Sequence, residues 1–359
     1  MKALKYLFAL LLSSMMINAE AQEKYFSVLG KVVDSATGQP LAGASAFCPS
    51  TTYGTVSNAD GNFYLRLPYG GYDLNISYTG YQKQSIRLSQ TTQVPDTMVI
   101  NLVKQENTLG EVAVVASNEV PDGFSKYGQF FLDNFVGTTE NAKSCTLKNP
   151  DALRFFYRKK TNTLKVLAKE DLEVQNLALG YNIRIALDSF NYDYKNSIYQ
   201  FTALTFFQEI DTTEEVKEEW KKNRARTYLG SRLHFMRSYY DSTLQEEGFI
   251  VEKLEAGDKA EKITSLYDSM QVERDSSVVN VLWDGKYRVS YKSVLPDQKF
   301  LKQFKLPSNT RSQPTLLVVN GGFVIEQNGY FYDQYDVLAN GYWSWKAISE
   351  ALPYDYLYE

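Results

Sequence analysis

The sequence predicts a mainly β protein in which a small β-sandwich precedes a larger β-rich region of α+β type. Residues 30–81 consist of alternating apolar segments separated by turn-forming pairs, which is typical of a sandwich. Near the C-terminus, Asp284-Gly285 and Asn328-Gly329 each stand between apolar segments and predict hairpins. Apolar residues recur every three or four positions over 225–244, which predicts one long helix or two short ones.

The first segment of the chain has the pattern of a secretory signal peptide. Lys2 and Lys5 precede an apolar run over 6–12, and the A-x-A triplet Ala19-Glu20-Ala21 follows. We therefore expect residues 1–21 to be removed by cleavage between Ala21 and Gln22. Gln22 is not cysteine, so no lipid anchor is indicated. The protein is expected to be exported, to the periplasm first of all, with an outer-membrane-associated or extracellular location as alternatives.

Composition indicates a globular protein and argues against one class of partner. Hydrophobic residues make up 44% of the chain and charged residues 22%, with a formal net charge of -4. This balance lacks the basic excess of nucleic-acid-binding proteins. The 27 tyrosines and 20 phenylalanines fit strands, which favour aromatic residues. An aromatic glycan-binding surface is the alternative explanation.

Four short motifs in the predicted sandwich carry a resemblance. They are Gly-x-Val-x-Asp at 30–34, Pro-Leu-x-Gly-Ala at 40–44, Asp-Gly-x-Phe at 60–63 and Tyr-Thr-Gly-Tyr at 78–81. Residues 26–103 resemble the carboxypeptidase regulatory-like domain, a transthyretin-like seven-stranded β-sandwich. The resemblance implies a domain over 22–103. In that family the domain is attached to metallocarboxypeptidases and to TonB-dependent receptors and is not itself catalytic, so no activity is implied.

Residues 104–128 are predicted to be a linker or connecting strand. Pro121-Asp122-Gly123 is a turn signal within it. Residues 109–115 resemble the segment that follows the same module in TonB-dependent receptors. Its candidate interaction residues are Leu109, Glu111, Val112 and Val114. The alternative is a strand that pairs within the protein.

Residues 129–359 form the predicted second domain, whose first half reads as strands. Two hairpins are expected, 153–158 with 164–168 and 181–190 with 199–207. In the helical region that follows, Val216 and Trp220 lie opposite the apolar stripe of an ideal helix. The helix therefore either breaks near Asn223 or is covered on both faces. Gly230 is unfavourable inside a helix, which indicates a close backbone approach there.

The last third returns to strands. Residues 278–283 and 286–291 are expected to pair around Asp284-Gly285, and 323–327 and 330–333 around Asn328-Gly329. Residues 341–345 are a short helix candidate. The glycan-binding alternative uses exposed aromatic residues such as Trp343 and Trp345.

The second region carries a resemblance as well. Its motifs are Phe-Val-Gly-Thr-Thr at 135–139, Cys145 with Asn149-Pro150, Leu-Gly-Tyr at 179–181, the residues at 228–237 and Gly-Tyr-Trp at 341–343. With the sandwich, they resemble the carboxypeptidase-like regulatory domain-containing proteins of Gram-negative envelopes. That resemblance implies an architecture and a location but no activity.

The residue inventory limits catalysis. A zinc carboxypeptidase needs two histidines and a carboxylate, whereas this chain contains His234 alone. No phosphate-binding loop or dinucleotide motif is present, and no metal or cofactor is predicted. The chain does contain the residues for a catalytic cysteine–histidine pair, Cys145 and His234, so this possibility stays open. A pair of catalytic carboxylates cannot be recognised from spacing, because such a pair is assembled in space.

These observations predict an exported, non-catalytic envelope protein that binds another protein through β-rich surfaces. A glycan-binding accessory protein and an enzyme with carboxylate chemistry are the alternatives. The sequence leaves open the identity of the partner, the oligomeric state and whether Cys48 pairs with Cys145, although free, buried thiols are favoured.

Overall fold

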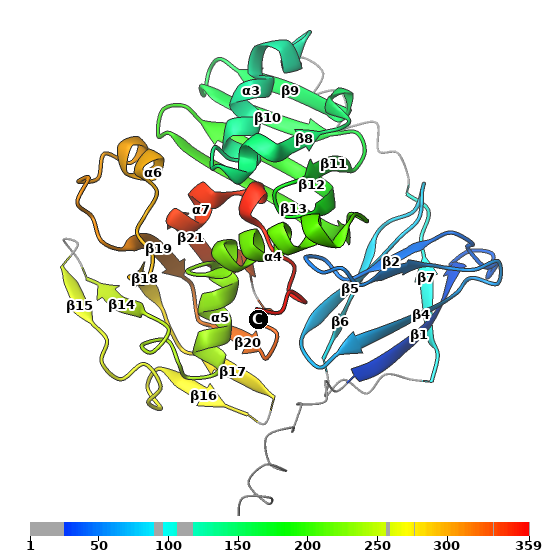
Figure 1. Cartoon of the computed structure of the whole chain (residues 1–359). Helices are drawn as coiled ribbons and strands as arrows, with labels where there is room; N and C mark the ends of the chain where they lie inside the picture. The colour runs from blue at the N-terminus through cyan, green and yellow to red at the C-terminus, as the bar shows by residue number, and fades with distance from the viewer. Residues whose placement is uncertain are drawn as a thin grey trace, which may run out of the picture.

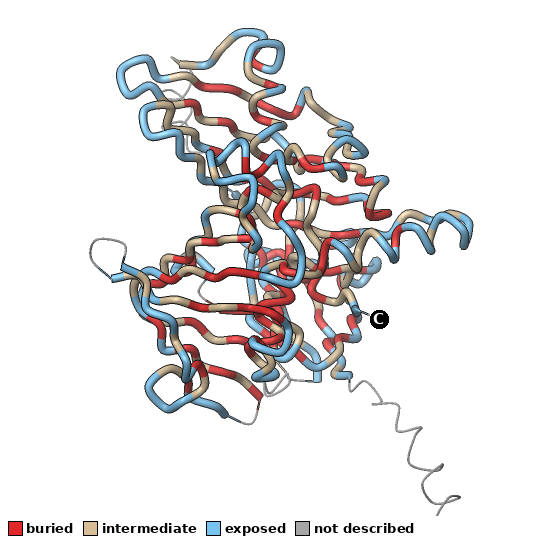
Figure 2. The backbone as a smooth tube through the Cα atoms, turned by 60° about the vertical axis from the view of Figure 1, so that its left-hand side comes forward, coloured by how far each residue is buried: buried red, intermediate tan, exposed pale blue. Residues whose placement is uncertain are grey.

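A computed structural model describes residues 25–89, 96–105, 118–255, 259–275, 277–332 and 334–358 (Figure 1). Strands account for 41% of the residues and helices for 19%, which confirms the predicted mainly β class. Buried residues follow the strands of each sheet, and exposed residues follow the loops (Figure 2).

The N-terminal sandwich consists of seven strands between residues 25 and 102. They are β1 (Tyr25–Asp34), β2 (Ser45–Phe47), β3 (Gly54–Val56), β4 (Asn62–Pro68), β5 (Tyr72–Ser77), β6 (Gln84–Leu88) and β7 (Met98–Leu102). Two sheets form, with strand orders β4-β1-β7 and β3-β2-β5-β6. Val28 and Leu65 from one sheet share a buried core with Leu74 and Ile76 from the other. Alternation between core and solvent thus produces the sandwich that the sequence predicted.

The next part is a six-stranded sheet with a helix on one face. Its strands are β8 (Cys145–Leu147), β9 (Leu153–Arg158), β10 (Thr163–Ala168), β11 (Leu172–Asn176), β12 (Tyr181–Asp193) and β13 (Ile198–Glu209), ordered β8-β11-β12-β10-β9 with β13 beside β12. The β9–β10 and β12–β13 pairings confirm both predicted hairpins. The short helices η1 (Asn141–Ser144) and η2 (Pro150–Ala152) flank β8.

Helix α3 (Gly123–Phe135) was not predicted, because Pro121-Asp122-Gly123 was interpreted only as a turn. That turn leads directly into the helix. Phe131 and Phe135 of α3 are buried with Phe155 and Phe190 of the sheet. The spacing of the aromatic residues along α3 matches a helical period and was the signal that the sequence offered.

The remaining strands form two sheets around helix α5. The strands are β14 (Phe249–Leu254), β15 (Ala260–Lys262), β16 (Val272–Arg274), β17 (Val278–Val281), β18 (Gly285–Tyr291), β19 (Gln313–Val319), β20 (Phe323–Glu326) and β21 (Val337–Gly341). Their orders are β15-β14-β18-β19-β21 and β16-β17-β20. The helices are α4 (Glu214–Tyr228), α5 (Arg232–Tyr240), α6 (Gln298–Gln303), α7 (Tyr342–Lys346), η3 (Gln334–Asp336) and η4 (Ile348–Glu350). Phe235 and Tyr239 of α5 pack with Trp283 in the shared core.

The hairpin predicted at Asp284-Gly285 is wrong. Strand β17 pairs with β16 and β20, whereas β18 pairs with β14 and β19. Trp283 precedes the turn and is fully buried in the core common to both sheets. The chain therefore crosses from one sheet to the other here instead of folding back.

The second hairpin signal, Asn328-Gly329, is confirmed. The Glu326 N–H donates to the Tyr330 carbonyl at 2.9 Å, and the Tyr332 N–H donates to the Val324 carbonyl at 2.9 Å. The returning segment is short and makes an isolated bridge to β20. The helix candidate at 341–345 is confirmed as α7.

The predicted helix over the apolar stripe breaks at Gly230, not near Asn223. Helix α4 ends at Tyr228, and α5 begins at Arg232. Gly230 lies between them with a φ of 73°, a left-handed conformation that glycine adopts readily. Trp220, which an ideal helix would place opposite the stripe, is buried and donates through Nε1 to the Leu177 carbonyl at 2.7 Å.

One sheet of the sandwich packs against the C-terminal region, residues 118–358. Figure 1 shows β2, β5 and β6 toward that region and β1, β4 and β7 on the far side. Phe47 of β2 contacts Phe206 edge to face, with ring centroids 5.7 Å apart. The Ser50 N–H donates to the Thr205 carbonyl at 2.6 Å, and the Phe207 N–H donates to the Thr51 carbonyl at 3.0 Å. The turn after β2 therefore pairs with the edge of β13.

Candidate functional site

The three-stranded sheet β4-β1-β7 has an outward side with several exposed side chains, which we call the outer face. Alternate residues of these strands point into the sandwich core, so their neighbours point to solvent. Four large side chains there are exposed by 39%, 45%, 52% and 58%: Tyr25, Leu29, Tyr64 and Val99, respectively. Leu29 lies directly opposite Tyr64, and Val99 lies opposite Lys31.

Polar contacts fix the orientation of the aromatic residues on this face. The hydroxyls of Ser27 and Tyr64 are 3.1 Å apart, and the Arg66 guanidinium lies 4.1 Å from the centre of the Tyr25 ring. The charged side chains that alternation places outward on β1, β4 and β7 are Lys31 and Arg66, both positive. The outer face is therefore apolar at its centre and positively charged.

A second cluster joins the sandwich to the C-terminal region. The Tyr330 hydroxyl donates to Asp73 on β5, and the Arg87 guanidinium on β6 lies 4.2 Å from the centre of the Tyr332 ring. The Tyr332 hydroxyl donates to Glu326 Oε1 at 2.7 Å. Glu326 is only 1% exposed, and its Oε2 has no hydrogen-bond partner among the described residues. Burial raises the pKa of this carboxyl above its ordinary value.

We expect Glu326→Gln to become increasingly favourable for stability as pH rises. Because the folded protein raises the pKa of Glu326, its ionisation opposes folding as pH increases from about 4.3, the ordinary value, toward the folded value. Glutamine does not ionise and keeps an oxygen for Tyr332. Melting temperatures of both proteins between pH 4.5 and 7.5 should therefore diverge in favour of the variant. Parallel curves would contradict a buried ionising carboxyl.

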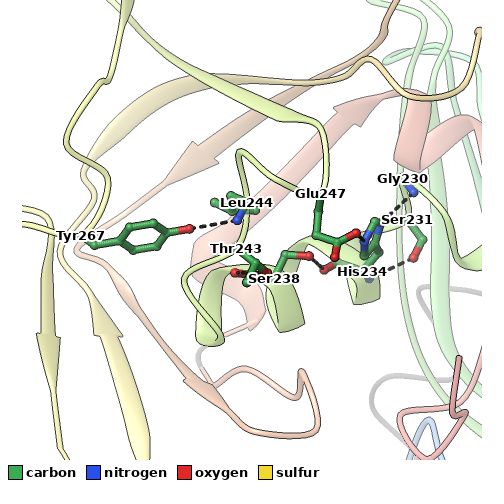
Figure 3. Close-up of polar contacts among 8 residues, drawn as sticks. All are labelled: Gly230, Ser231, His234, Ser238, Thr243, Leu244, Glu247 and Tyr267. Carbon is green, nitrogen blue, oxygen red and sulfur yellow. Dashed lines mark hydrogen bonds and ion pairs between the residues drawn. The ribbon is translucent and has the colours of Figure 1, made fainter.

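His234 holds a turn in place (Figure 3). Its Nδ1 accepts from the Gly230 N–H at 3.1 Å, and its Nε2 lies 3.1 Å from Glu247 Oε2. Because Nδ1 accepts a hydrogen bond, the proton resides on Nε2, which donates to Glu247. Burial is the main cause that lowers the pKa of His234 below its ordinary value, which keeps the ring neutral. The Ser231 hydroxyl caps α5 by accepting from the His234 N–H.

The structure does not assemble the Cys145–His234 pair that the sequence left open. The Cys145 thiol contacts the Asn141 carbonyl at 3.5 Å, while Gly230 and Glu247 occupy both ring nitrogens of His234. Burial raises the pKa of Cys145 to about 12 and raises that of Cys48 further, so neither thiol ionises at neutral pH. Both cysteines are free, with Cys48 buried and Cys145 half-buried.

The expected exposure of the two tryptophans is wrong for Trp345 and only partial for Trp343. Trp345 is 6% exposed and packs with Phe300 and Tyr342. Trp343 is half-buried and donates through Nε1 to the Gly230 carbonyl at 2.7 Å. Helix α7 packs on β19 and β21, and this packing covers the Trp345 ring and part of the Trp343 ring.

The other predicted site residues lie outside the described residues. They are Ala21 and Gln22 at the expected cleavage site, and Leu109, Glu111, Val112 and Val114 in the connecting segment. Across the ranges that the structure describes, no group of three or more His, Cys, Asp and Glu side chains is placed to hold a metal ion. None of the described helices is long and apolar enough to cross a membrane.

Sequence reasoning did not single out the outer face. The alternation of β1 and β4 indicated which residues share a side, but not which side the C-terminal region covers. Tyr64 and Leu29 therefore could not be distinguished from Phe47, which has the same apolar character and is buried.

Residues 28–114 match the family model of the CarboxypepD_reg-like domain. This region is a CarboxypepD_reg-like domain. The match covers the sandwich except Tyr25, Phe26 and Ser27 at the start of β1, and it confirms the resemblance seen in the sequence.

Two relatives share part of the chain. TonB-dependent receptor SusC from Bacteroides thetaiotaomicron is 29% identical over 138 residues, which cover 35% of this chain and 14% of the receptor. TonB-dependent receptor P3 from Formosa agariphila is 26% identical over 147 residues, which cover 41% of this chain and 13% of that receptor. The chain thus matches about a seventh of each receptor. These relatives are consistent with an envelope location for the CarboxypepD_reg-like domain.

Two solved structures align with parts of this chain at low TM-scores. A membrane-associated protein of unknown function from Bacteroides fragilis aligns with 52% of this chain and 96% of its own, at 13% identity and a TM-score of 0.18. A 9R-lipoxygenase from Cyanothece aligns with 62% of this chain and 49% of its own, at 10% identity and a TM-score of 0.17. Scores this low do not establish a common fold with the CarboxypepD_reg-like domain or the C-terminal region.

Proposed function

We propose that this chain is an exported, non-catalytic accessory protein of the bacterial cell envelope that binds another protein through the outer face. The observation that carries this proposal is the asymmetry of the sandwich. On the outward side of β3-β2-β5-β6, Phe47 packs within the molecule and, among the described residues, only the edge strand β3 presents an exposed large apolar residue, Val56. On the other sheet, Leu29, Tyr64 and Val99 are all exposed. Contiguous exposed apolar residues on a sheet typically mark an interaction surface.

The charge of the outer face defines the partner. Lys31 and Arg66 flank the apolar residues, so a complementary partner surface has an apolar centre and acidic groups around it. Two copies of the outer face brought together would place these cations opposite one another. The proposed partner is therefore a different protein. The TonB-dependent receptor relatives support an envelope protein as that partner.

The absence of catalysis is part of the proposal. His234 is neutral and engaged at both nitrogens, and both thiols are protonated, so nucleophilic catalysis by these groups is disfavoured. The glycan-binding alternative relied on exposure of Trp343 and Trp345, and the burial of Trp345 removes much of its support.

Photochemical cross-linking tests the surface directly. A photoreactive phenylalanine at Tyr64 should form one discrete adduct with an envelope protein in intact cells. The same residue at Val56 is the matched control, because Val56 lies on the other sheet of the same sandwich and is 62% exposed. Equal adducts at both positions, or none at Tyr64, would argue against the outer face.

A binding measurement with the identified partner follows. Val99→Asp should weaken affinity by about tenfold or more, because it places a negative charge in an apolar contact and opposite the acidic groups of the partner. Val56→Asp introduces the same charge at a similarly exposed valine and should leave affinity unchanged. Retention of wild-type affinity by Val99→Asp would reject the proposed surface.

A further inference from the structure

A cavity of about 290 Å³ lies between α6 and the outward side of the sheet β15-β14-β18-β19-β21. Leu254 and Leu316 line it from the sheet, and Phe304 and Leu306 line it from α6 and the residues after it. The polar residues of the lining are Arg288, Thr315 and Asn340. The Thr315 hydroxyl is buried and accepts from the Trp343 N–H at 3.3 Å. The volume lies near the lower end of the range for small-molecule sites.

Strand register builds the sheet side of the cavity. Arg288 on β18 lies opposite Glu252 on β14 and Leu316 on β19, and Leu316 lies opposite Asn340 on β21. The intervening residues, such as Tyr287, point into the core on the other side of the sheet. Alternation therefore places the Arg288 guanidinium and the Asn340 amide among leucines on the solvent side.

Helix α6 supplies the opposite side. Its N-cap, Asp297, accepts from the Lys299 N–H at 2.7 Å, which fixes the start of the helix. Phe300 is buried against Tyr342 and Trp345, and its ring centre lies 4.6 Å from that of Phe304. This packing holds the partly exposed Phe304 above the sheet.

The charges favour an anionic group in the ligand. Arg288 Nε donates to Glu252 Oε2 at 2.7 Å, and no other hydrogen bond of the guanidinium is found among the described residues. Its terminal nitrogens can therefore meet a carboxylate in the two-pronged geometry that arginine favours. Lys286, two residues earlier on the same side of β18, adds a further positive charge. With Glu252 counted, these three side chains leave one net positive charge.

We propose that this cavity binds an apolar ligand that carries one terminal carboxylate and has on the order of ten non-hydrogen atoms. The carboxylate contacts Arg288, and the apolar part lies among Leu254, Leu316 and Phe304. A sugar fits poorly, because its hydroxyls would lose hydrogen bonds to water against the leucines. The same chemistry is provided by a free aromatic or aliphatic acid and by the C-terminal apolar residue of a protein.

Titration of the mature chain with three probes tests the inference, with binding followed by NMR chemical shifts. 3-Phenylpropionate and N-acetyl-Gly-Gly-Phe with a free carboxylate should both saturate the protein. 3-Phenylpropanamide should bind at least about tenfold more weakly, because it lacks the charge that strengthens the hydrogen bonds to arginine. Arg288→Gln should weaken both acids by a similar factor. Lys253→Gln is the matched control, since Lys253 lies on the other side of β14 over the Tyr287 ring and should have no effect.

A second variant separates loss of binding from loss of folding. Leu316→Trp fills the cavity without changing its charge and should abolish binding, while the melting temperature reports that the variant is folded. Tighter binding of the peptide than of the free acid assigns the site to a protein C-terminus, and the reverse order assigns it to a free acid. The inference fails if neither acid saturates, if the amide binds as tightly as the acids, or if folded Leu316→Trp retains binding.

Discussion

Replacing Gly230 by alanine should lower the free energy of unfolding by about 2 to 5 kcal/mol. The left-handed backbone at Gly230, with a φ of 73°, accounts for about 1 to 2 kcal/mol of strain in any residue with a Cβ. The added methyl group would also overlap the Tyr291 ring and lie 2.8 Å from Gln313 Oε1. Overpacking of this kind costs about 1 to 3 kcal/mol.

Urea denaturation of Gly230→Ala beside Gly321→Ala measures the two contributions. Gly321 has a similar φ of 80° but open space around the position of a Cβ, so its variant should show only the backbone strain. The Gly230 variant should lose more, because the turn also donates to His234 Nδ1 and accepts from Trp343 Nε1. If both variants lose the same free energy of unfolding, the overlap with the Tyr291 ring does not contribute to the cost of Gly230→Ala.

The sequence predicted a close backbone approach at Gly230, but it placed the possible break in the helix near Asn223 and not at Gly230. A glycine within an apolar stripe indicated a close backbone approach, and the approach of Tyr291 confirms it. The stripe itself continues in phase from Ala225 through Leu233, although α4 and α5 are separate helices. The spacing of apolar residues indicates which side of a helix is buried. Two consecutive helices whose buried sides stay in register therefore show the same spacing as one continuous helix.

The Asn-Gly and Asp-Gly pairs predicted where the chain turns, but they did not reliably predict whether the two flanking strands pair with each other. Asn328-Gly329 closes a short hairpin, whereas Asp284-Gly285 lies where the chain passes between two sheets. Both pairs suit residues with positive φ, and such a turn fixes local direction only. The burial of Trp283 decides the second case, and that burial depends on α5 and on strands far away in the sequence.

The candidate site depended on long-range packing that no local pattern contains. Alternation in β1 and β4 predicted a sandwich with one exposed side on each sheet. Which sheet remains exposed is decided by contacts such as Phe47 with Phe206 and Asp73 with Tyr330. The same limitation applies to Trp345, whose aromatic character suited a binding surface as well as a core.

Replacing Gly71 by valine should separate the unfolding of the sandwich from that of the C-terminal region. A Cβ at Gly71 would overlap Glu326 Cγ and lie 2.9 Å from a carbon of the Tyr330 ring and 3.0 Å from the Tyr332 hydroxyl oxygen. These three residues all belong to the C-terminal region and are buried there, so they cannot all move away without loss of the bond from Asn328 Nδ2 to the Gly71 carbonyl.

Differential scanning calorimetry should show one transition for the wild-type protein, because contacts at Ser50, Asp73 and Arg87 couple the two parts. The Gly71→Val protein should show two transitions, with the sandwich melting at the lower temperature because a small domain buries a smaller fraction of its surface.

Gly80→Ala is the control: Gly80 has a φ of 84° and open space around it, so this variant strains the sandwich without disturbing the contact. It should keep a single transition. Two transitions already in the wild-type protein would mean that the sandwich unfolds independently of the region on which it packs. One unchanged transition in Gly71→Val would mean that contacts other than the one at Gly71 suffice to couple the two parts.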